Sequence, residues 1–550
     1  MFKLTIRASA LAAALGALSL GAAASCFADG APQTLIDLIR AHQRDAVLAA
    51  ITSPDIDVNA ADPDGSTPLM WATYTVDHEL VRELLKKGAK AKVTNRYGSS
   101  PLGEAVKLGD SEMVSMLLDA GADANSPNQD GQTALMLASN IGSLPIAQLL
   151  IAHGANVNAI ETFRGQNALM WAAAENHPDV VDLLLAHGAN VKLRARYDDW
   201  PREMTSEPRA QFNQTGGLTA LLYATRSGCY RCAVAIVKAG ADVNQPNPDG
   251  ITPLINALDS RDYDIAMFLL DKGANASAWD MTGRTPLYVA VDMNSYRGRG
   301  IGGPTGFAGY AGPTAAHPRS KATAMDVVNR LLAMGVDPNH ELTRMRPNGN
   351  GRGRFEDYMM RGGTGAVMIA SMSFDDVALQ ALLDHGAEAD VPNVFQITPL
   401  MAVAGMSGAG RGNGYGPQQG DLQDRAMKVV DLLLAHGANI NARVTDSHTH
   451  TAKLVAYVQG RDHEGQTALF AAAEAGWDRV TKDLLDHGAD ANIRDASGKL
   501  ALDYAKAPPP VGPGVAPIRA DPASRAHTVA LLAALVPGSS GVSADIAAAK

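Results

Sequence analysis

The chain has 550 residues, a formal net charge of −10 at pH 7 and only 5% aromatic residues. Nucleic-acid-binding domains concentrate lysine and arginine, so this acidic balance argues against a dedicated nucleic-acid-binding protein. The length would allow three or four ordinary globular domains, but an internal repeat of fixed period overrides that count.

Residues 1–28 have the features of a secretory signal peptide. Lys3 and Arg7 precede an apolar run of alanine and leucine. This run is too short, and too rich in glycine and alanine, for a stable membrane span. Cleavage is expected after Ala24 or Ala28. This segment therefore predicts an exported protein, periplasmic or secreted, of a Gram-negative bacterium.

Cys26 leaves a second interpretation of this segment open. The stretch AASC is similar to the end of a lipoprotein signal, in which the cysteine carries the lipid, although Ala23 stands where leucine is usual. No later stretch approaches about 18 uninterrupted apolar residues, so we expect no transmembrane segment. A lipid on Cys26 would be the alternative means of membrane attachment.

A unit of about 33 residues recurs along the rest of the chain. One copy starts at Gly65 with GSTPLMWATYTVDHELVRELLKKGAKA, and another starts at Gly465 with GQTALFAAAEAGWDRVTKDLLDHGADA. In the first copy, Thr67 can cap a short helix and Pro68 suits its first turn. The run HELVRELLKK has apolar residues at helical spacing, and Gly88 can end that second helix in the left-handed conformation. Each unit therefore predicts two short helices and a hairpin.

The glycine that closes the second helix recurs through most of the chain. It stands at positions 88, 121, 154, 188, 240, 273, 335, 386, 437 and 488. The period, the TPL motif and the GAD or GAN run after the closing glycine resemble the ankyrin-repeat family. This resemblance implies an all-α repeat solenoid of about twelve stacked ankyrin repeats, each a helix-turn-helix with a β-hairpin finger, and long loop insertions. It also implies a scaffold or adaptor role.

The resemblance divides the chain into repeats, caps and a tail. Residues 29–64 are predicted to form an N-terminal capping repeat, and residues 498–535 a C-terminal capping repeat with a proline-rich break. The repeats between them are expected at 65–192, 215–294 and 322–497, and a flexible tail at 536–550. Neither helix of a unit can bury its apolar face alone, so neighbouring units must stack.

Five insertions stretch the period. Three extend the hairpin fingers, at 193–214, 341–361 and 443–462, and two extend the turn between the helices, at 295–321 and 408–424. Insertions in repeat proteins often map to a binding face. Arginine beside aromatic residues is a composition enriched at protein interfaces. The predicted partner-binding residues are Arg194, Arg196, Tyr197, Trp200, Arg352, Arg354, Phe355 and Tyr358.

Cys229 and Cys232 form a Cys-x-x-Cys motif where a second helix is expected to begin. Three interpretations stay open: a disulfide, two free thiols that fill the core, or a redox pair with a lowered thiol pKa. No histidine follows for haem attachment. The pair is therefore a candidate for chemistry as well as for packing.

No other motif predicts catalysis, a cofactor or a metal site. A histidine precedes the closing glycine in several units, but equivalent residues one layer apart should be about 10 Å from each other, too far for two ligands of one zinc ion. We therefore expect a non-enzymatic scaffold that binds a protein partner through its concave face, fingers and insertions. The alternatives are a ligand- or glycan-binding envelope protein and a thiol-redox role for the cysteine pair.

Overall fold

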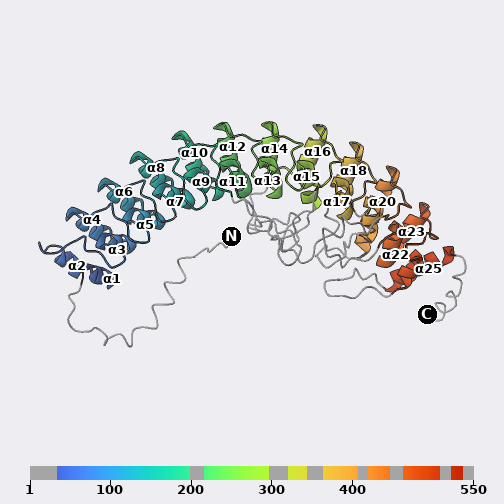
Figure 1. Cartoon of the computed structure of the whole chain (residues 1–550), viewed down its shortest axis with the longest axis horizontal. Helices are drawn as coiled ribbons and strands as arrows, with labels where there is room; N and C mark the ends of the chain where they lie inside the picture. Colours follow the sequence, from blue (N-terminus) through green and yellow to red (C-terminus); the bar gives the residue numbers. More distant parts are fainter. Residues whose placement is uncertain are drawn as a thin grey trace, which may run out of the picture. The chain divides into compact units, whose positions relative to one another are not determined.

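The computed structural model describes residues 34–197, 216–295, 320–343, 363–394, 396–406, 419–445, 463–507 and 522–536. The chain divides into two compact units, Met1–Asn190 and Val191–Lys550. Both units consist of helix pairs (Figure 1).

The first unit holds five helix pairs. Their bounds are α1 Leu35–Arg40, α2 Arg44–Ala50, α3 Pro68–Tyr74, α4 His78–Lys86, α5 Pro101–Leu108, α6 Ser111–Asp119, α7 Ala134–Ile141, α8 Leu144–Ala152, α9 Ala168–Ala174 and α10 Pro178–Ala186. The first helices of successive pairs lie side by side in one row, and the second helices form another row (Figure 1). This arrangement is the stack that the period predicted.

The second unit continues the pattern with longer interruptions. Its bounds are α11 Ala220–Ser227, α12 Tyr230–Lys238, α13 Pro253–Asp259, α14 Tyr263–Asp271, α15 Pro286–Ser295, α16 Ala324–Ala333, α17 Ala366–Met372, α18 Asp376–Asp384, α19 Pro399–Met401, η3 Ala402–Met406, α20 Gln419–Ala435, α22 Ala468–Ala475, α23 Asp478–Asp486, α24 Ala501–Lys506 and α25 Pro522–Leu535. Over the described ranges the two units hold twelve helix pairs, which confirms the predicted all-α repeat solenoid.

Local sequence explains where these helices begin and end. The Thr67 hydroxyl accepts the backbone N–H of Met70, and the Ser100 hydroxyl accepts that of Gly103 in the next repeat. These bonds satisfy donors that a helix leaves free at its first turn. Gly88, just after α4, has φ +85°, a conformation that residues with a Cβ rarely adopt. In these repeats a capping residue marks the start of a first helix, and a left-handed glycine follows the end of a second helix.

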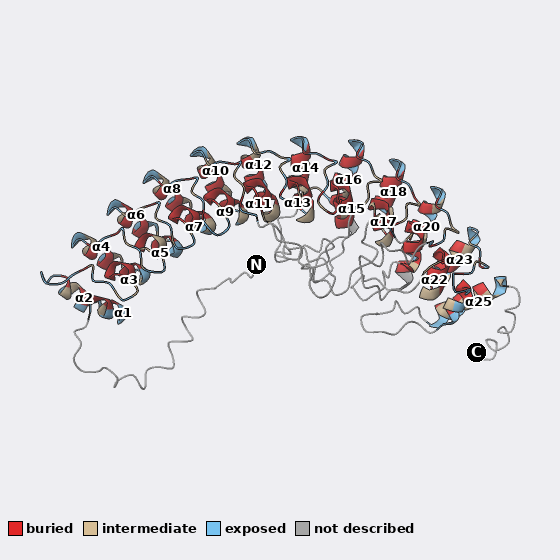
Figure 2. Ribbon diagram, viewed as in Figure 1, coloured by how far each residue is buried: buried red, intermediate tan, exposed pale blue. Residues whose placement is uncertain are grey.

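The core lies where the helices of a pair meet each other and the next pair. Leu69, Leu102, Leu135 and Leu169 occupy the same place in successive first helices, and all four are buried. Figure 2 shows buried residues concentrated on the first helices, whereas the ends of the second helices are exposed. The buried positions recur at the helical period, so a helix such as α4 has an apolar face in the core and a polar face toward solvent.

The hairpin fingers contain isolated bridges rather than extended strands in the described residues. Such bridges join Arg194 to Thr219 and Glu341 to Gly365. Each finger without an insertion links the second helix of one pair to the first helix of the next through a single turn, so its two arms are short. No helix in the described part of the chain is long and apolar enough to cross a membrane.

The insertions lie mostly outside the described residues. Residues 198–215, 296–319, 344–362, 407–418 and 446–462 are not described. Helix α20 begins at Gln419, so part of the range 408–424 expected as an insertion is helical. Before it, η3 has a wide backbone turn in which Gly405 has φ +120°.

Candidate interaction surfaces

Backbone hydrogen bonds join several neighbouring hairpin fingers within each unit. In the first unit, the N–H of Arg96 donates to the carbonyl of Asp64 at 2.8 Å, and that of Thr162 donates to Asp130 at 3.0 Å. Equivalent bonds in the second unit join Met281 to Asp249, Thr343 to Thr282 and Ala496 to Glu464. The finger tips are therefore held in place, so their exposed side chains form a fixed surface.

Two finger tips of the first unit expose an aromatic side chain. Tyr97 is 61% exposed and Phe163 is 69% exposed. The guanidinium of Arg164 lies 5.6 Å from the ring centre of Phe163. These two residues are not among the predicted partner-binding residues, although an aromatic residue within two positions of the turn glycine of a finger was a signal that could have found them. Exposed aromatic rings beside arginine are typical of protein-binding surfaces.

The structure brings together three of the predicted partner-binding residues. Arg194 pairs with Thr219 and Tyr197 with Gly216 in isolated bridges. The carbonyl of Arg196 accepts the N–H of Gly217 at 3.1 Å. These contacts form the base of the finger that carries the predicted insertion 193–214, of which residues 193–197 are described.

The side chains at this base differ in their freedom. Tyr197 is 56% exposed, and Arg196 is exposed as well, so both can meet a partner. Arg194 is half-buried and donates to the carbonyl of Gly217 at 3.3 Å. The other predicted residues, Trp200, Arg352, Arg354, Phe355 and Tyr358, lie outside the described residues.

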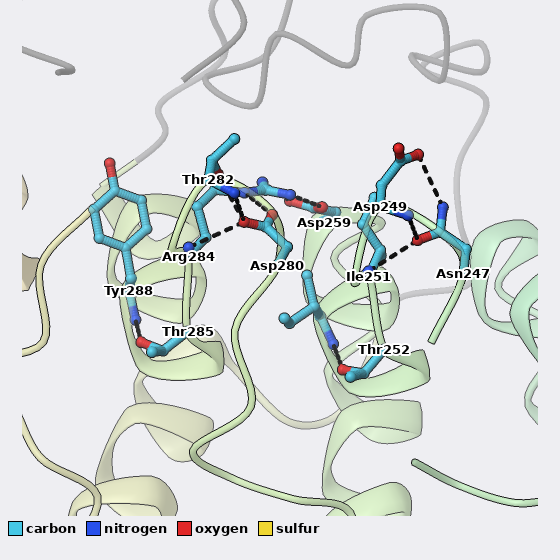
Figure 3. Close-up of polar contacts among 11 residues, drawn as sticks. Asn247, Asp249, Ile251, Thr252, Asp259, Asp280, Thr282, Arg284, Thr285 and Tyr288 are labelled. Atoms are coloured by element: carbon cyan, nitrogen blue, oxygen red, sulfur yellow. Dashed lines mark hydrogen bonds and ion pairs between the residues drawn. The ribbon is translucent and has the colours of Figure 1, made fainter. Parts of the chain in front are cut away.

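A buried ion-pair network fixes another finger of the second unit (Figure 3). Arg284 is completely buried, and its Nε donates to a carboxylate oxygen of Asp280 at 2.6 Å. Its two terminal nitrogens donate to both oxygens of Asp259, at 2.9 and 3.1 Å. Asp259 ends α13, whereas Asp280 and Arg284 belong to the following finger. The guanidinium therefore clamps this finger to the preceding helix.

Electrostatics favour the ionised forms of Arg284 and Asp280. Burial opposes the charge of Arg284, but the adjacent Asp259 and Asp280 outweigh it, so the pKa of the guanidinium is raised. Burial likewise opposes the charge of Asp280, but Arg284 and the hydroxyl of Thr282 hold the pKa of that carboxyl below its usual value. The groups pair with one another in the interior, which indicates a structural role.

The clamp positions an exposed tryptophan that stacks on a half-buried histidine. Trp279 directly precedes Asp280 and is 60% exposed. Its ring stacks on His340 of the next finger, with ring centres 5.7 Å apart and planes 28° from parallel. Sequence reasoning missed Trp279, because its exposure depends on how the two fingers lie together. These two rings add an aromatic surface to the second unit.

Cys229 and Cys232 are joined by a disulfide, with Cα atoms 5.2 Å apart. Cys229 is the N-cap residue of α12, and its sulfur accepts the backbone N–H of Cys232 at 3.2 Å. Cys229 is 2% exposed and Cys232 is fully buried. Of the three interpretations of the motif, the structure has the disulfide.

Two of the histidines before the closing glycines lie near a carboxylate of the preceding repeat, and one of these also lies near a carboxylate of its own helix. His153 lies 3.7 Å from Asp119, and His487 lies 4.0 Å from Asp431 and 3.5 Å from Asp483. The ligand atoms of this last group lie within 4.8 Å of one another. Sequence reasoning considered only the distance between equivalent histidines of successive repeats. It therefore could not predict that a histidine lies near a carboxylate. Asp431 and His487 are exposed, so solvated ion pairing accounts for the group.

Comparisons with known proteins agree with the repeat pattern. A family model described as ankyrin repeats (3 copies) matches residues 35–128, 117–195 and 221–298, and a model of the single ankyrin repeat matches residues 464–496. The Neurogenic locus Notch protein of Drosophila melanogaster is similar, with 33% identity over 116 residues. That match covers 21% of this chain and 4% of the Notch protein, so the chain spans only a small part of this relative.

Proposed function

Because the chain belongs to the ankyrin-repeat family, we propose that it is a non-enzymatic scaffold that binds a protein partner. Recognition would use the finger tips, the first helices and the insertions. The observation that carries this proposal is a set of exposed aromatic side chains on ordered hairpin fingers. Tyr97, Phe163 and Trp279 stand on fingers whose backbones are bonded to a neighbouring finger, and Tyr197 stands at the base of a finger closed by its own bridges.

The finger tips suit protein binding for two physical reasons. Tyrosine and tryptophan are among the residues that carry most binding energy at interfaces. A side chain on a backbone that is already ordered loses less entropy on binding than one on a free loop. Tyr197 and Arg196 combine both properties at the base of one finger.

The test uses a partner that has been identified and purified. Tagged protein with a photo-crosslinking residue at position 197 would capture the partner from the native envelope, and mass spectrometry would identify it. The dissociation constant would then be measured for the wild type, Tyr197→Ala and Trp279→Ala. We expect each substitution to weaken binding about tenfold or more if it removes a hot-spot side chain.

The control for this test lies on a second helix. Val377 of α18 is 59% exposed, and its change to alanine should leave the affinity unchanged. Wild-type affinity in every finger variant, including Tyr97→Ala and Phe163→Ala, would rule out the fingers as the binding surface.

We also propose that the partner lies outside the cytoplasm, because residues 1–28 have the pattern of a signal peptide. Cell fractionation and the mass of the mature N-terminus would test this. A Cys26→Ala variant separates the two forms of export, because only a lipid anchor needs that thiol. Unprocessed protein in the cytoplasm would contradict the proposal.

A further inference from the structure

Asp262 is a buried residue, and within the described part of the chain one of its carboxylate oxygens lacks a hydrogen-bond donor. The residue is 5% exposed, and its Oδ2 is buried and accepts no hydrogen bond. Other aspartates at the start of second helices, such as Asp77 and Asp110, accept a backbone N–H of their own helix. Asp262 starts α14 and makes no such bond. Its carboxylate is therefore directed elsewhere.

The carboxylate of Asp262 lies against the turn that leads into the disulfide. A Cβ built on Gly228 would be 2.9 Å from both carboxylate oxygens, and Gly228 directly precedes Cys229. The equivalent aspartate of an earlier repeat, Asp110, lies 2.7 Å from the Nε2 of His78. In the cysteine repeat, Tyr230 stands at the position of that histidine. The carboxylate thus meets the start of α12 without the partner that Asp110 has.

The surroundings of Asp262 favour its protonated form. Burial, with a smaller contribution from Asp264, raises the pKa of the Asp262 carboxyl to about 7. The carboxylate of Asp264 itself accepts the backbone N–H groups of Lys321 and Ala322. Arg261 and Tyr263 flank Asp262 in the chain. The charged neighbours therefore leave this carboxyl able to exchange a proton near neutral pH.

The disulfide itself has little use as a cross-link. It closes a loop with a sequence separation of three residues, and the entropic stabilisation by a disulfide is smallest for short loops. The start of α12 is already held, because the N–H of Cys229 donates to Ala224 and the carbonyl of Cys229 accepts from Ala233. A stabilising role therefore does not account for the pair.

We propose that Cys229, Cys232 and Asp262 form a thiol–disulfide centre that exchanges with dithiols and disulfides, in which Asp262 accepts and returns the proton of the Cys229 thiol. The inference goes beyond the proposed binding function and does not depend on it. The sulfur of Cys229 suits the reactive role, because it accepts the N–H of Cys232 at the N-terminus of a helix, which stabilises a thiolate.

In the oxidising direction, the protein dithiol becomes a disulfide in two steps. The Cys229 thiol gives its proton to the Asp262 carboxylate, and its sulfur attacks a disulfide R–S–S–R, which breaks and releases one thiolate. The Cys232 thiol loses its proton, attacks the mixed disulfide at Cys229 and releases the second thiolate. The two protons pass to the two released thiolates, so one R–S–S–R becomes two R–SH while the protein dithiol becomes a disulfide. Reduction by a dithiol is the reverse.

Burial makes this exchange slow but specific. Because Cys229 is 2% exposed and Cys232 is fully buried, the turn must open before a reagent reaches the sulfur. Small dithiols and disulfides are therefore the class of reactant that fits.

The test measures how fast the pair oxidises at different pH values. Full-length protein is reduced with dithiothreitol, desalted and mixed with oxidised glutathione from pH 5.5 to 8.5. Acid quenching, maleimide labelling and peptide mass spectrometry then score Cys229 and Cys232 separately from Cys26. The wild-type rate should rise with an inflection near pH 7, because the base must be ionised.

The Asp262→Asn variant should oxidise about tenfold more slowly at pH 7, since an unassisted thiol with a pKa of about 8.5 is only a few per cent ionised there. Its rate should rise only with thiol ionisation. Asp110→Asn, in a repeat without cysteines, should match the wild type. A purely structural effect of Asp262 would change the rate without removing the inflection, which would overturn the proposal.

Two measurements on the wild-type protein test the proposal even if Asp262→Asn does not fold. A wild-type profile without an inflection near pH 7 would overturn it. So would a folded wild-type dithiol that fails to react over hours while the urea-unfolded chain reacts.

Discussion

The guanidinium of Arg284 forms a two-pronged ion pair with Asp259, a residue 25 positions earlier that ends the preceding first helix. Both terminal nitrogens of the arginine are used, and its Nε bonds to Asp280 in the same finger (Figure 3). The finger that bears Trp279 is therefore attached to α13 through one fully buried side chain.

Replacing Arg284 with alanine should destabilise the second unit by about 3–5 kcal/mol, because the buried carboxylate of Asp280 and the half-buried carboxylate of Asp259 lose their counter-charge. Urea denaturation would measure the loss. The triple variant Arg284→Met, Asp259→Asn, Asp280→Asn should recover part of it, since no buried charge is then unpaired. A loss below about 1 kcal/mol for Arg284→Ala would show that the network is not a clamp.

Two glycines separate backbone strain from steric contact. Gly88 has φ +85° with nothing within 4 Å of a built Cβ, so Gly88→Ala should cost about 1–2 kcal/mol from its left-handed backbone alone. Gly98 has φ +71°, and a Cβ there would be 2.5 Å from the backbone nitrogen of Gln129 in the next finger. Gly98→Ala should therefore be clearly the more destabilising in thermal melts, and equal losses would contradict the close finger contact.

Acid should loosen the last helix pair. Burial opposes the charge of Asp478, but bonds from Ser524, His527 and Gln423 hold the pKa of its carboxyl below the usual value. These bonds join α23 to α20 and α25. Because the folded-state pKa is lowered, their stabilisation is present above the ordinary pKa of aspartate and is lost as the pH falls through the folded-state pKa. Hydrogen exchange in α25 should therefore accelerate at low pH.

The Asp478→Asn variant is the control for this acid response. It should show fast exchange in α25 already at neutral pH and a weaker change on acidification. A variant with wild-type protection of α25 at both pH values would show that these bonds do not hold the helix.

Asp262 should have the opposite pH dependence. Its pKa is raised to about 7 by burial, so the folded state keeps a proton that the unfolded state releases between the ordinary pKa and about 7. Stability therefore falls as the pH rises through that window. Asp262→Asn should be more stable than the wild type at pH 8, by a few kcal/mol at roughly 1.4 kcal/mol per pKa unit, and should show little gain at pH 4. Denaturation at both pH values would measure this, and an equal gain at both would contradict a buried, ionising carboxyl.

Much of the fold could be predicted because its causes are local. The Thr67 cap, the apolar spacing of each helix and the left-handed glycine at 88 all act within one repeat. The 33-residue period then required stacking, since neither helix buries its apolar face alone. Arg194, Arg196 and Tyr197 could be singled out from the sequence because they combine arginine with an aromatic residue inside the insertion 193–214, and their role in binding stays a prediction.

What sequence could not predict is which side chains meet between neighbouring repeats. Trp279 is part of an aromatic surface because its ring stacks on His340 of the next finger, a contact that the sequence does not reveal. The side chain of Gln423 caps α23, accepting the N–H of Arg479 at 3.0 Å, because Trp477 occupies the N-cap position and has no acceptor to offer.

The sequence by itself therefore determined the helix pairs, their ends and their repetition, because hydrogen bonds and apolar spacing act over a few residues. Only the tertiary structure decided that Arg284 reaches Asp259 and that Asp262 lies against Gly228 beside the disulfide. These contacts depend on how one repeat packs on the next, and a repeat period specifies the order of the layers but not the rotamers that meet between them.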